Sequence, residues 1–321
     1  MPQAILNSAA EWAERFGDAG KRTVVTIGNF DGVHLGHQKI LRGIFEQARA
    51  TSLMATVLTF YPHPARVLRP DEAPELLATL PQRLAAFEAA QLDAALVLRF
   101  DAELAKVTAE EFARTYLVET LRARAVMVGG NFRFGHRQAG DVKLLEALGK
   151  QWDFELQIVP PVVADGVVVS SSAIRQALRD GRVEEAARLL GRPFGLAGKI
   201  QPGTGQGRKL VVPTLNLATE QECLPRNGVY ATETEVGGKL YRSATNIGVR
   251  PTFDSSRLTV ESHLLGFAEN LTSGRMEVRF RTRLRDEQKF PSPADLRTQV
   301  LTDIERAQEY FRSVGPASKR G

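Results

Sequence analysis

A strand, a glycine turn and a helix in the first fifty residues constrain the fold of this chain most. The β-branched run at residues 24–27 predicts a buried strand, the glycines after it permit a tight turn, and residues 36–50 have a helical pattern. His34 and His37 therefore stand where a strand passes into a helix N-terminus. Unpaired N–H groups and the positive end of the helix dipole favour phosphate at such a place. The stretch predicts an α/β site that handles a nucleotide.

The two histidines have other interpretations when taken alone. They can cap the helix, form a surface pair or supply half of a metal site. With five histidines and one cysteine in the chain, and no further ligand at suitable spacing, zinc is disfavoured. No Gly-x-x-x-x-Gly-Lys-Ser/Thr loop occurs, which disfavours an ordinary P-loop kinase. We interpret the pair as donors to a polyphosphate while charge builds on a leaving pyrophosphate.

The rest of the first half alternates strand and helix patterns. Strands are expected at 53–60, 94–99, 125–128 and 155–159, with helices at 81–90, 109–119 and 142–148. Alternation of this kind predicts a parallel, doubly wound, Rossmann-like sheet, whose ligands lie beyond the carboxyl ends of the strands. Because His34, His63 and Asn131 each follow such an end, we expect one crevice to gather them.

The pattern changes after two further helices at 170–180 and 183–191. Short strands follow at 196–200, 214–217, 228–234, 239–247, 259–264 and 276–284, and an amphipathic helix at 293–311 closes the chain. Regularly spaced strands separated by turn residues predict a small antiparallel β-barrel. We therefore expect one domain over residues 1–187, a second over 188–315 and a flexible tail at 316–321.

Composition limits the classes of function. A chain of 321 residues can bury two cores, and a net charge of +5 suits anionic substrates without indicating nucleic acid. The single cysteine, Cys223, excludes an internal disulfide and fits a reducing compartment. The acidic start and the lack of a long apolar run predict a cytoplasmic protein without a membrane segment. We expect a monomer or a weak oligomer with small-molecule partners.

Two more motifs in the first half stand at the boundaries of predicted elements: one follows a strand and the other begins a helix. Asn131 lies in the glycine-rich run 129–136, which forms either a structural turn or a nucleotide contact. The serines at 170–172 begin a helix that also carries Arg175. They act either as a simple N-cap or as ligands of ATP phosphates.

Taken in order, His-x-Gly-His at 34–37, the run at 129–135 and the serines with Arg175 resemble the bifunctional bacterial riboflavin kinase/FMN adenylyltransferases, the prokaryotic FAD synthetases. The resemblance implies a nucleotidylyltransferase domain, in which the FMN phosphate attacks the α-phosphorus of ATP and releases pyrophosphate. It implies catalytic roles for His34 and His37. It implies nucleotide and phosphate contacts for Gly28, Phe30, His34, His37, Asn131, Ser171, Ser172 and Arg175.

The second half carries its own candidate site. Residues 203–208 form a glycine-rich loop that either wraps a polyphosphate or makes a hairpin turn. Thr214 and Asn216 offer oxygen ligands suited to Mg²⁺. Glu261 interrupts an apolar strand, either as one half of a surface salt bridge or as a general base.

These segments resemble the riboflavin kinase module of the same family. The resemblance implies that Glu261 activates the riboflavin 5′-hydroxyl and that Thr214 and Asn216 hold Mg²⁺ with ATP. It makes FMN and FAD substrates or products instead of prosthetic groups. It implies ATP or flavin contacts for Gly203, Gly205, Gly207, Arg208, Thr214, Asn216, Asn246 and Arg285. The chain departs from the family pattern at Tyr61, Val168, Val211 and Leu215.

Two alternatives to this bifunctional enzyme stay open at the sequence level. The first is a nucleotidylyltransferase for another phosphate acceptor, with the barrel as a binding module. The second is a nucleic-acid binder that uses a basic strip of arginines at 275, 279, 281, 283 and 285.

Overall fold

The computed structural model describes residues 4–17, 20–202, 212–251, 256–267, 269 and 271–315. The chain forms two compact units, Met1–Ser171 and Ser172–Gly321. This division lies before the boundary that we expected after residue 187, because two helices, α7 (Ser171–Arg179) and α8 (Val183–Leu190), group with the second unit. The expected flexible tail at 316–321 lies outside the described residues.

The first unit contains a six-stranded, fully parallel sheet in the order β1-β4-β3-β2-β5-β6. Its strands are β1 (Ala4–Leu6), β2 (Thr23–Ile27), β3 (Met54–Tyr61), β4 (Ala94–Arg99), β5 (Ala123–Gly129) and β6 (Glu155–Val159). The parallel α/β prediction is confirmed. β1 is a strand that the sequence pattern did not indicate, and it extends the sheet beyond β4.

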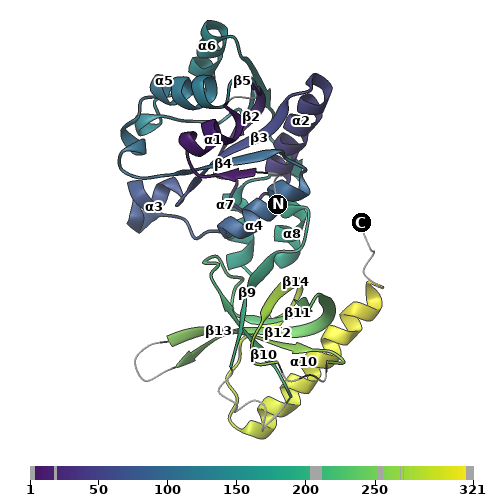
Figure 1. Cartoon of the computed structure of the whole chain (residues 1–321). Coiled ribbons are helices and arrows are strands. Elements are labelled where there is room, and N and C mark those ends of the chain that lie inside the picture. The colour runs from purple at the N-terminus through teal and green to yellow at the C-terminus, as the bar shows by residue number, and fades with distance from the viewer. Residues whose placement is uncertain are drawn as a thin grey trace. The chain divides into compact units, whose positions relative to one another are not determined.

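Helices cover both faces of this sheet (Figure 1). The helices with residues in these two cores are α1 (Ala9–Phe16), α2 (Leu35–Thr51), α4 (Leu80–Ala89), η2 (Leu104–Lys106), α5 (Ala109–Phe112), η3 (Ala113–Thr120) and α6 (Val142–Trp152). The short helices α3 (Pro64–Leu68), η1 (Pro70–Glu72) and η4 (His136–Gln138) complete the unit. The helix expected at 109–119 widens after Phe112 into the π-helical segment η3.

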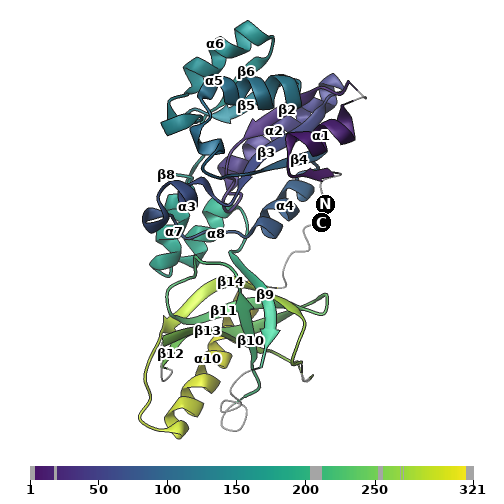
Figure 2. The same cartoon turned by 60° about the vertical axis from the view of Figure 1, so that its left-hand side comes forward.

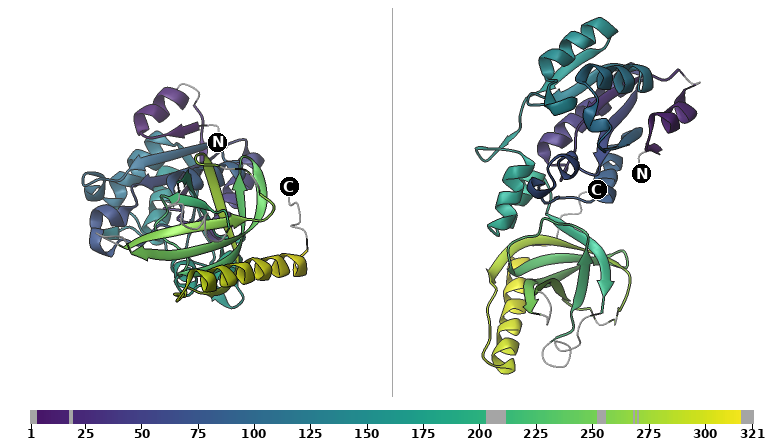
Figure 3. Two further views of the ribbon diagram at one scale, coloured as in Figure 1. Left: turned by 90° about the horizontal axis from the view of Figure 1, so that it is seen from below. Right: turned by 90° about the vertical axis from the view of Figure 1, so that its left-hand side faces the viewer.

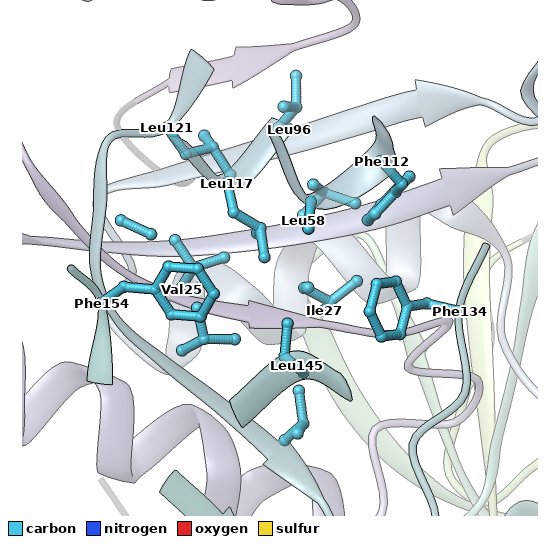
Figure 4. Packing of buried hydrophobic residues seen from close by; sticks show 14 of the residues in the cluster. Val25, Ile27, Leu58, Leu96, Phe112, Leu117, Leu121, Phe134, Leu145 and Phe154 are labelled. Carbon is cyan, nitrogen blue, oxygen red and sulfur yellow. The ribbon is translucent and has the colours of Figure 1, made fainter. Parts of the chain in front are cut away.

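Alternation along the strands explains the two faces. Val25 and Ile27 point to the face covered by α1, α5, η3 and α6, where Phe112 and Leu145 pack on them (Figure 4). Their neighbour Val24 points to the opposite face, against α2 and α4. A strand with both faces buried has an unbroken apolar pattern, as parallel sheets require. The turn that carries His34 and His37 thus follows a strand that is buried along its whole length.

The second unit is a closed antiparallel barrel in the order β10-β13-β12-β11-β14-β9. Its strands are β9 (Gly195–Gln201), β10 (Leu215–Thr219), β11 (Gly228–Val236), β12 (Lys239–Pro251), β13 (Ser256–Leu264) and β14 (Arg275–Asp286). The predicted barrel is confirmed. Helices α7 (Ser171–Arg179) and α8 (Val183–Leu190) precede it, and a small hairpin, β7 (Val163–Ala164) with β8 (Val167–Val168), ends the first unit.

The last helix, α10 (Pro293–Ser313), lies along the outside of the barrel (Figures 2 and 3). Ile304, Ala307 and Phe311 pack there on Ala231 of β11 and Ala244 of β12. This confirms the predicted amphipathic helix. No helix in the described part of the chain has both the length and the apolar character that a membrane crossing requires.

Candidate functional sites

His34 is the N-cap of α2, and its ring is fixed by its own helix. Its Nδ1 accepts a hydrogen bond from the backbone N–H of His37 at 3.3 Å. In the neutral imidazole this acceptor role places the proton on Nε2. The two imidazoles are stacked, with ring centroids 3.7 Å apart and planes 15° apart. The capping alternative and the phosphate-donor hypothesis are therefore compatible, because the cap sets the tautomer that donates.

His37 is held neutral by its surroundings. Burial, with a smaller contribution from the neighbouring His34, keeps the pKa of His37 well below its usual value. Its Nδ1 is buried, and no described residue bonds it. Phe30 supports the ring from one side at a centroid distance of 5.0 Å. A neutral imidazole can donate one proton to a phosphate oxygen without a charge buried in the ground state.

The turn before these histidines is conformationally unusual. Phe30, Gly32 and Val33 all have positive φ angles, of 52°, 81° and 42°. For Phe and Val that conformation is strained and needs support from the surrounding structure. The Phe30 side chain is 2% exposed and packs edge-on against Phe87, so its side chain lies in the core beneath the site. Gly28 lies against the Phe30 ring, since a Cβ built on Gly28 would be 3.3 Å from a ring carbon.

The serine run meets the histidine turn at one residue. Ser171 donates from Oγ to the backbone oxygen of Asp31 at 2.9 Å. Ser172 is exposed at the start of α7 and Arg175 is buried on the same helix. Asn131 is exposed and lies two residues past the end of β5, the position that the sequence pattern gave it. Arg133, in the same glycine-rich run, forms an ion pair with Asp141 at 3.1 Å.

One register line crosses the barrel and joins four candidate residues of the second half. Glu261 on β13 lies opposite Asn216 on β10 and opposite Asn246 on β12. Val229 on β11 continues the line from Asn246 to Arg285 on β14. Directly opposite residues project from the same face of a sheet. The barrel therefore places these predicted side chains in one row.

The row lies on the outer face of the barrel. Ser262 and Thr245, the neighbours of Glu261 and Asn246 along their strands, are fully buried inside and hydrogen-bonded to each other at 2.7 Å. Alternation then turns Glu261 and Asn246 outward, where both are half-buried. Asn216 is 8% exposed.

Residues at the end of this row fit a magnesium ion. The Thr214 hydroxyl and the Asn216 amide are hard oxygen donors, which Mg²⁺ prefers. No group of three His, Cys, Asp or Glu in the described ranges could hold a metal by itself. An ion there would take its remaining ligands from water and the phosphates of ATP. Thr214 precedes β10 by one residue, so it stands at the strand end and not within the strand.

Arg285 is engaged by helix α10. Its Nε and Nη2 donate to the Asp303 carboxylate at 2.7 to 3.0 Å, and its Nη1 donates to the backbone oxygen of Asp286. Asp303 is 3% exposed and also accepts from Gln299. Sequence reasoning did not single out Asp303, since only the packing of α10 on the barrel brings it to Arg285.

The remaining sequence-level candidates divide into two groups. Gly203, Gly205, Gly207, Arg208 and the departure Val211 lie outside the described residues. Of the other departures, Tyr61 and Val168 are about half exposed, whereas Leu215 is buried at 8%.

Four of the five arginines in the predicted basic strip on β14 form ion pairs with acidic residues. Arg279 pairs with Glu235 and Glu277, and Arg281 pairs with Glu233. Arg283 pairs with Asp286, and Arg285 with Asp303. Phosphate binding needs cations that are not already compensated. This pairing argues against the nucleic-acid alternative.

Comparisons with known proteins match the two units in turn. The FAD synthetase family model matches residues 18–173, and the riboflavin kinase family model matches residues 190–311. The chain is 38% identical over 295 residues to the bifunctional riboflavin kinase/FMN adenylyltransferase of Escherichia coli (strain K12), covering 92% of this chain and 94% of that relative. The protein of the same description from Pseudomonas fluorescens is 37% identical over 286 residues, with 89% and 92% covered.

Among solved structures, the crystal structure of a macrolide-efflux protein from Streptococcus pneumoniae superposes with a TM-score of 0.83 at 30% identity, and covers 90% of this chain and 94% of that one. The order of the two family models, the relatives that match nearly the whole chain and the fold all indicate the same two-domain family. The chain belongs to the family of bifunctional riboflavin kinase/FMN adenylyltransferases, with an FAD synthetase domain followed by a riboflavin kinase domain.

Proposed function

We propose that the chain makes FMN and FAD at two separate sites. Residues 188–315 transfer the γ-phosphoryl group of ATP to riboflavin, and residues 1–187 transfer the adenylyl group of a second ATP to FMN. The substrates and products are riboflavin, FMN, FAD, ATP and pyrophosphate. With a single cysteine, which excludes an internal disulfide, the chain suits the reducing cytoplasm, where we place it as a monomer or a weak oligomer.

In the adenylyl transfer, an oxygen of the FMN phosphate attacks the α-phosphorus of ATP and the bond to the β-phosphate oxygen breaks. His34 and His37 donate hydrogen bonds to the phosphate oxygens as charge moves onto the leaving pyrophosphate. The backbone of Gly28 and Phe30 borders the nucleotide. Asn131 contacts the nucleotide or the ribityl chain, and Ser171, Ser172 and Arg175 hold the pyrophosphate. Most of the rate enhancement comes from positioning and electrostatics.

In the kinase reaction, Glu261 accepts the proton of the riboflavin 5′-hydroxyl while that oxygen attacks the γ-phosphorus and ADP leaves. Thr214 and Asn216 would hold Mg²⁺, which neutralises charge on the phosphates when bound. Asn246 orients the flavin or the nucleotide beside Glu261. Gly203, Gly205, Gly207 and Arg208 border the phosphates of ATP.

The observation that carries the kinase assignment is the row of Asn216, Glu261 and Asn246 on adjacent strands. A barrel that served only to bind a ligand for a different nucleotidylyltransferase would need no carboxylate between two amides on a half-buried face. The row therefore favours two reactions over one.

Two matched variants separate the sites. Glu261→Ala should abolish FMN formation from riboflavin and leave FAD formation from supplied FMN intact, and His37→Ala should do the reverse. Glu220→Gln, an exposed carboxylate just after β10, is the control for a charge change on the barrel. Loss of both activities in either variant would contradict separate sites. Riboflavin-dependent turnover of ATP that resists added salt would further dismiss the nucleic-acid alternative.

A further inference from the structure

A buried arginine of the first unit lies behind the histidine turn and belongs to none of the recognised motifs. Arg83 is on the first turn of α4, whose start is fixed by a capping box between Thr79 and Gln82. The residue is only 4% exposed. Burial lowers the pKa of its guanidinium, and the carboxylate of Asp31 opposes that effect. A buried cation is costly unless its hydrogen bonds are satisfied, so its partners identify what it is for.

The guanidinium joins the ends of two neighbouring parallel strands. Nη1 donates to the backbone oxygen of Asn29 at 2.7 Å, just after β2, and to Thr59 Oγ1 at 3.2 Å. Nη1 and Nη2 both reach the backbone oxygen of Phe60 near the end of β3, at 3.4 and 3.3 Å. These are the points at which the chain leaves the sheet, on β2 toward His34 and on β3 toward the Pro62 turn.

The segment that Arg83 holds is the strained one. Its contact at Asn29 directly precedes Phe30, the first of the residues with positive φ. At the other side of Phe30, the Asp31 carboxylate accepts from the backbone N–H groups of Leu77 and Ala78 at 3.0 to 3.2 Å. One cation on α4 and one anion on the turn thus tie the same loop to the start of α4. Two opposite anchors of this kind can maintain a conformation that the local sequence disfavours.

We propose that Arg83 is a positioning residue for adenylyl transfer: its planar fork fixes the 29–33 turn, and through that turn it sets where the imidazoles of His34 and His37 lie. The inference rests on the proposed role of these histidines. Arg83 itself touches no imidazole and acts through the backbone oxygens of Asn29 and Phe60. A lysine carries the same charge but lacks the planar fork, so charge alone does not replace it.

The bifunctional chain supplies its own control. We would measure kcat and KM for FAD formation from supplied FMN in Arg83→Lys and Arg83→Met, and the riboflavin kinase rate of the same samples. In both variants the kcat of adenylylation should fall about 100-fold, which is the effect expected when a catalytic group is misplaced. The KM for ATP should change much less. The kinase rate should stay at the wild-type level. Both tryptophans, Trp12 and Trp152, lie in the first unit, so their fluorescence shows whether that unit is folded.

Arg49→Lys is the matched control, since Arg49 also makes a fork, to Asp93, beside the amino end of β3. It should leave adenylylation unchanged. Imidazole ¹⁵N spectra of Arg83→Lys should show a changed tautomer signal for His34, which a general loss of stability in a still folded protein would not produce.

Wild-type kcat in folded Arg83→Lys, or an unchanged His34 signal, would overturn the inference. So would a fall in activity that only follows the unfolded fraction. Failure of the wild-type chain to make FAD would instead refute the proposed function, so the two failures are distinguishable.

Discussion

Glu261 lies directly opposite Asn216 in the register of β13 and β10. The pairing of β10 with β13, and not any sequence motif, brings this carboxylate beside an amide that is 45 residues away in the sequence. On the other side, Glu261 lies opposite Asn246 of β12, and the bond between Thr245 and Ser262 joins those two strands from inside the barrel. A proton acceptor and a metal ligand on one row can serve one phosphoryl transfer.

Replacement of Asn216 by alanine should raise the Mg²⁺ concentration that half-saturates the kinase by about tenfold or more, because an oxygen ligand is lost. FAD formation from supplied FMN should keep its wild-type Mg²⁺ dependence in the same sample. Magnesium titrations of both activities measure this. An equal shift in both would mean that Asn216 has no specific part in the kinase site.

Gly36→Ala should separate stability from activity. Alanine is preferred over glycine in a helix by about 1 kcal/mol, so the first unit should not lose stability. A Cβ at Gly36 would, however, lie 3.2 Å from His34 Nδ1 and Cε1 and displace the imidazole. Adenylylation kcat should fall by about 10-fold to 100-fold. Tryptophan-detected unfolding and FAD formation test both parts, and full activity would show that the His34 position is not critical.

The lowered pKa of His37 predicts a pH-dependent stability. In the unfolded chain this imidazole titrates near pH 6.5, whereas in the native state it stays neutral to a lower pH. Between the two pKa values only the unfolded state binds the proton, so the free energy of unfolding falls as pH drops below about 6.5. The slope from this group is at most about 1.4 kcal/mol per pH unit.

His37→Gln should remove this contribution. Urea unfolding of the first unit, followed by tryptophan fluorescence at several pH values, compares the two proteins. The same pH slope in wild type and variant would exclude His37 as its source.

Asp303→Asn should loosen α10 from the barrel. The change leaves the Arg285 guanidinium with a neutral partner in a buried position, which should cost the second unit about 3 kcal/mol. Cys223 is fully buried in this unit, so its rate of labelling by a thiol reagent at moderate urea reports the opening. Glu305→Gln, on an exposed position of the same helix, should label at the wild-type rate.

The sequence predicted most of this architecture because its signals are local. The apolar run of β2 and the alternation of the barrel strands follow from the side-chain period alone. β1 was missed because its three residues carry no recognisable pattern, and they become a strand only by pairing with β4.

The site was less predictable where tertiary packing decides the partners. Arg285 was expected at a ligand, yet Asp303 of α10 takes its donors. Phe30 was expected at the nucleotide, yet its ring is buried under His37. Arg83 has no local signal at all, because its partners lie on two strands far from α4 in the sequence.

The most direct measurement is a time course of the purified protein with riboflavin, ATP and Mg²⁺, with the flavins separated at each time. The two-site account predicts that FMN accumulates first and FAD follows, with FAD growing at the expense of FMN once riboflavin is consumed. FMN without FAD would contradict the assignment of His34 and His37. The absence of both products would contradict the account as a whole.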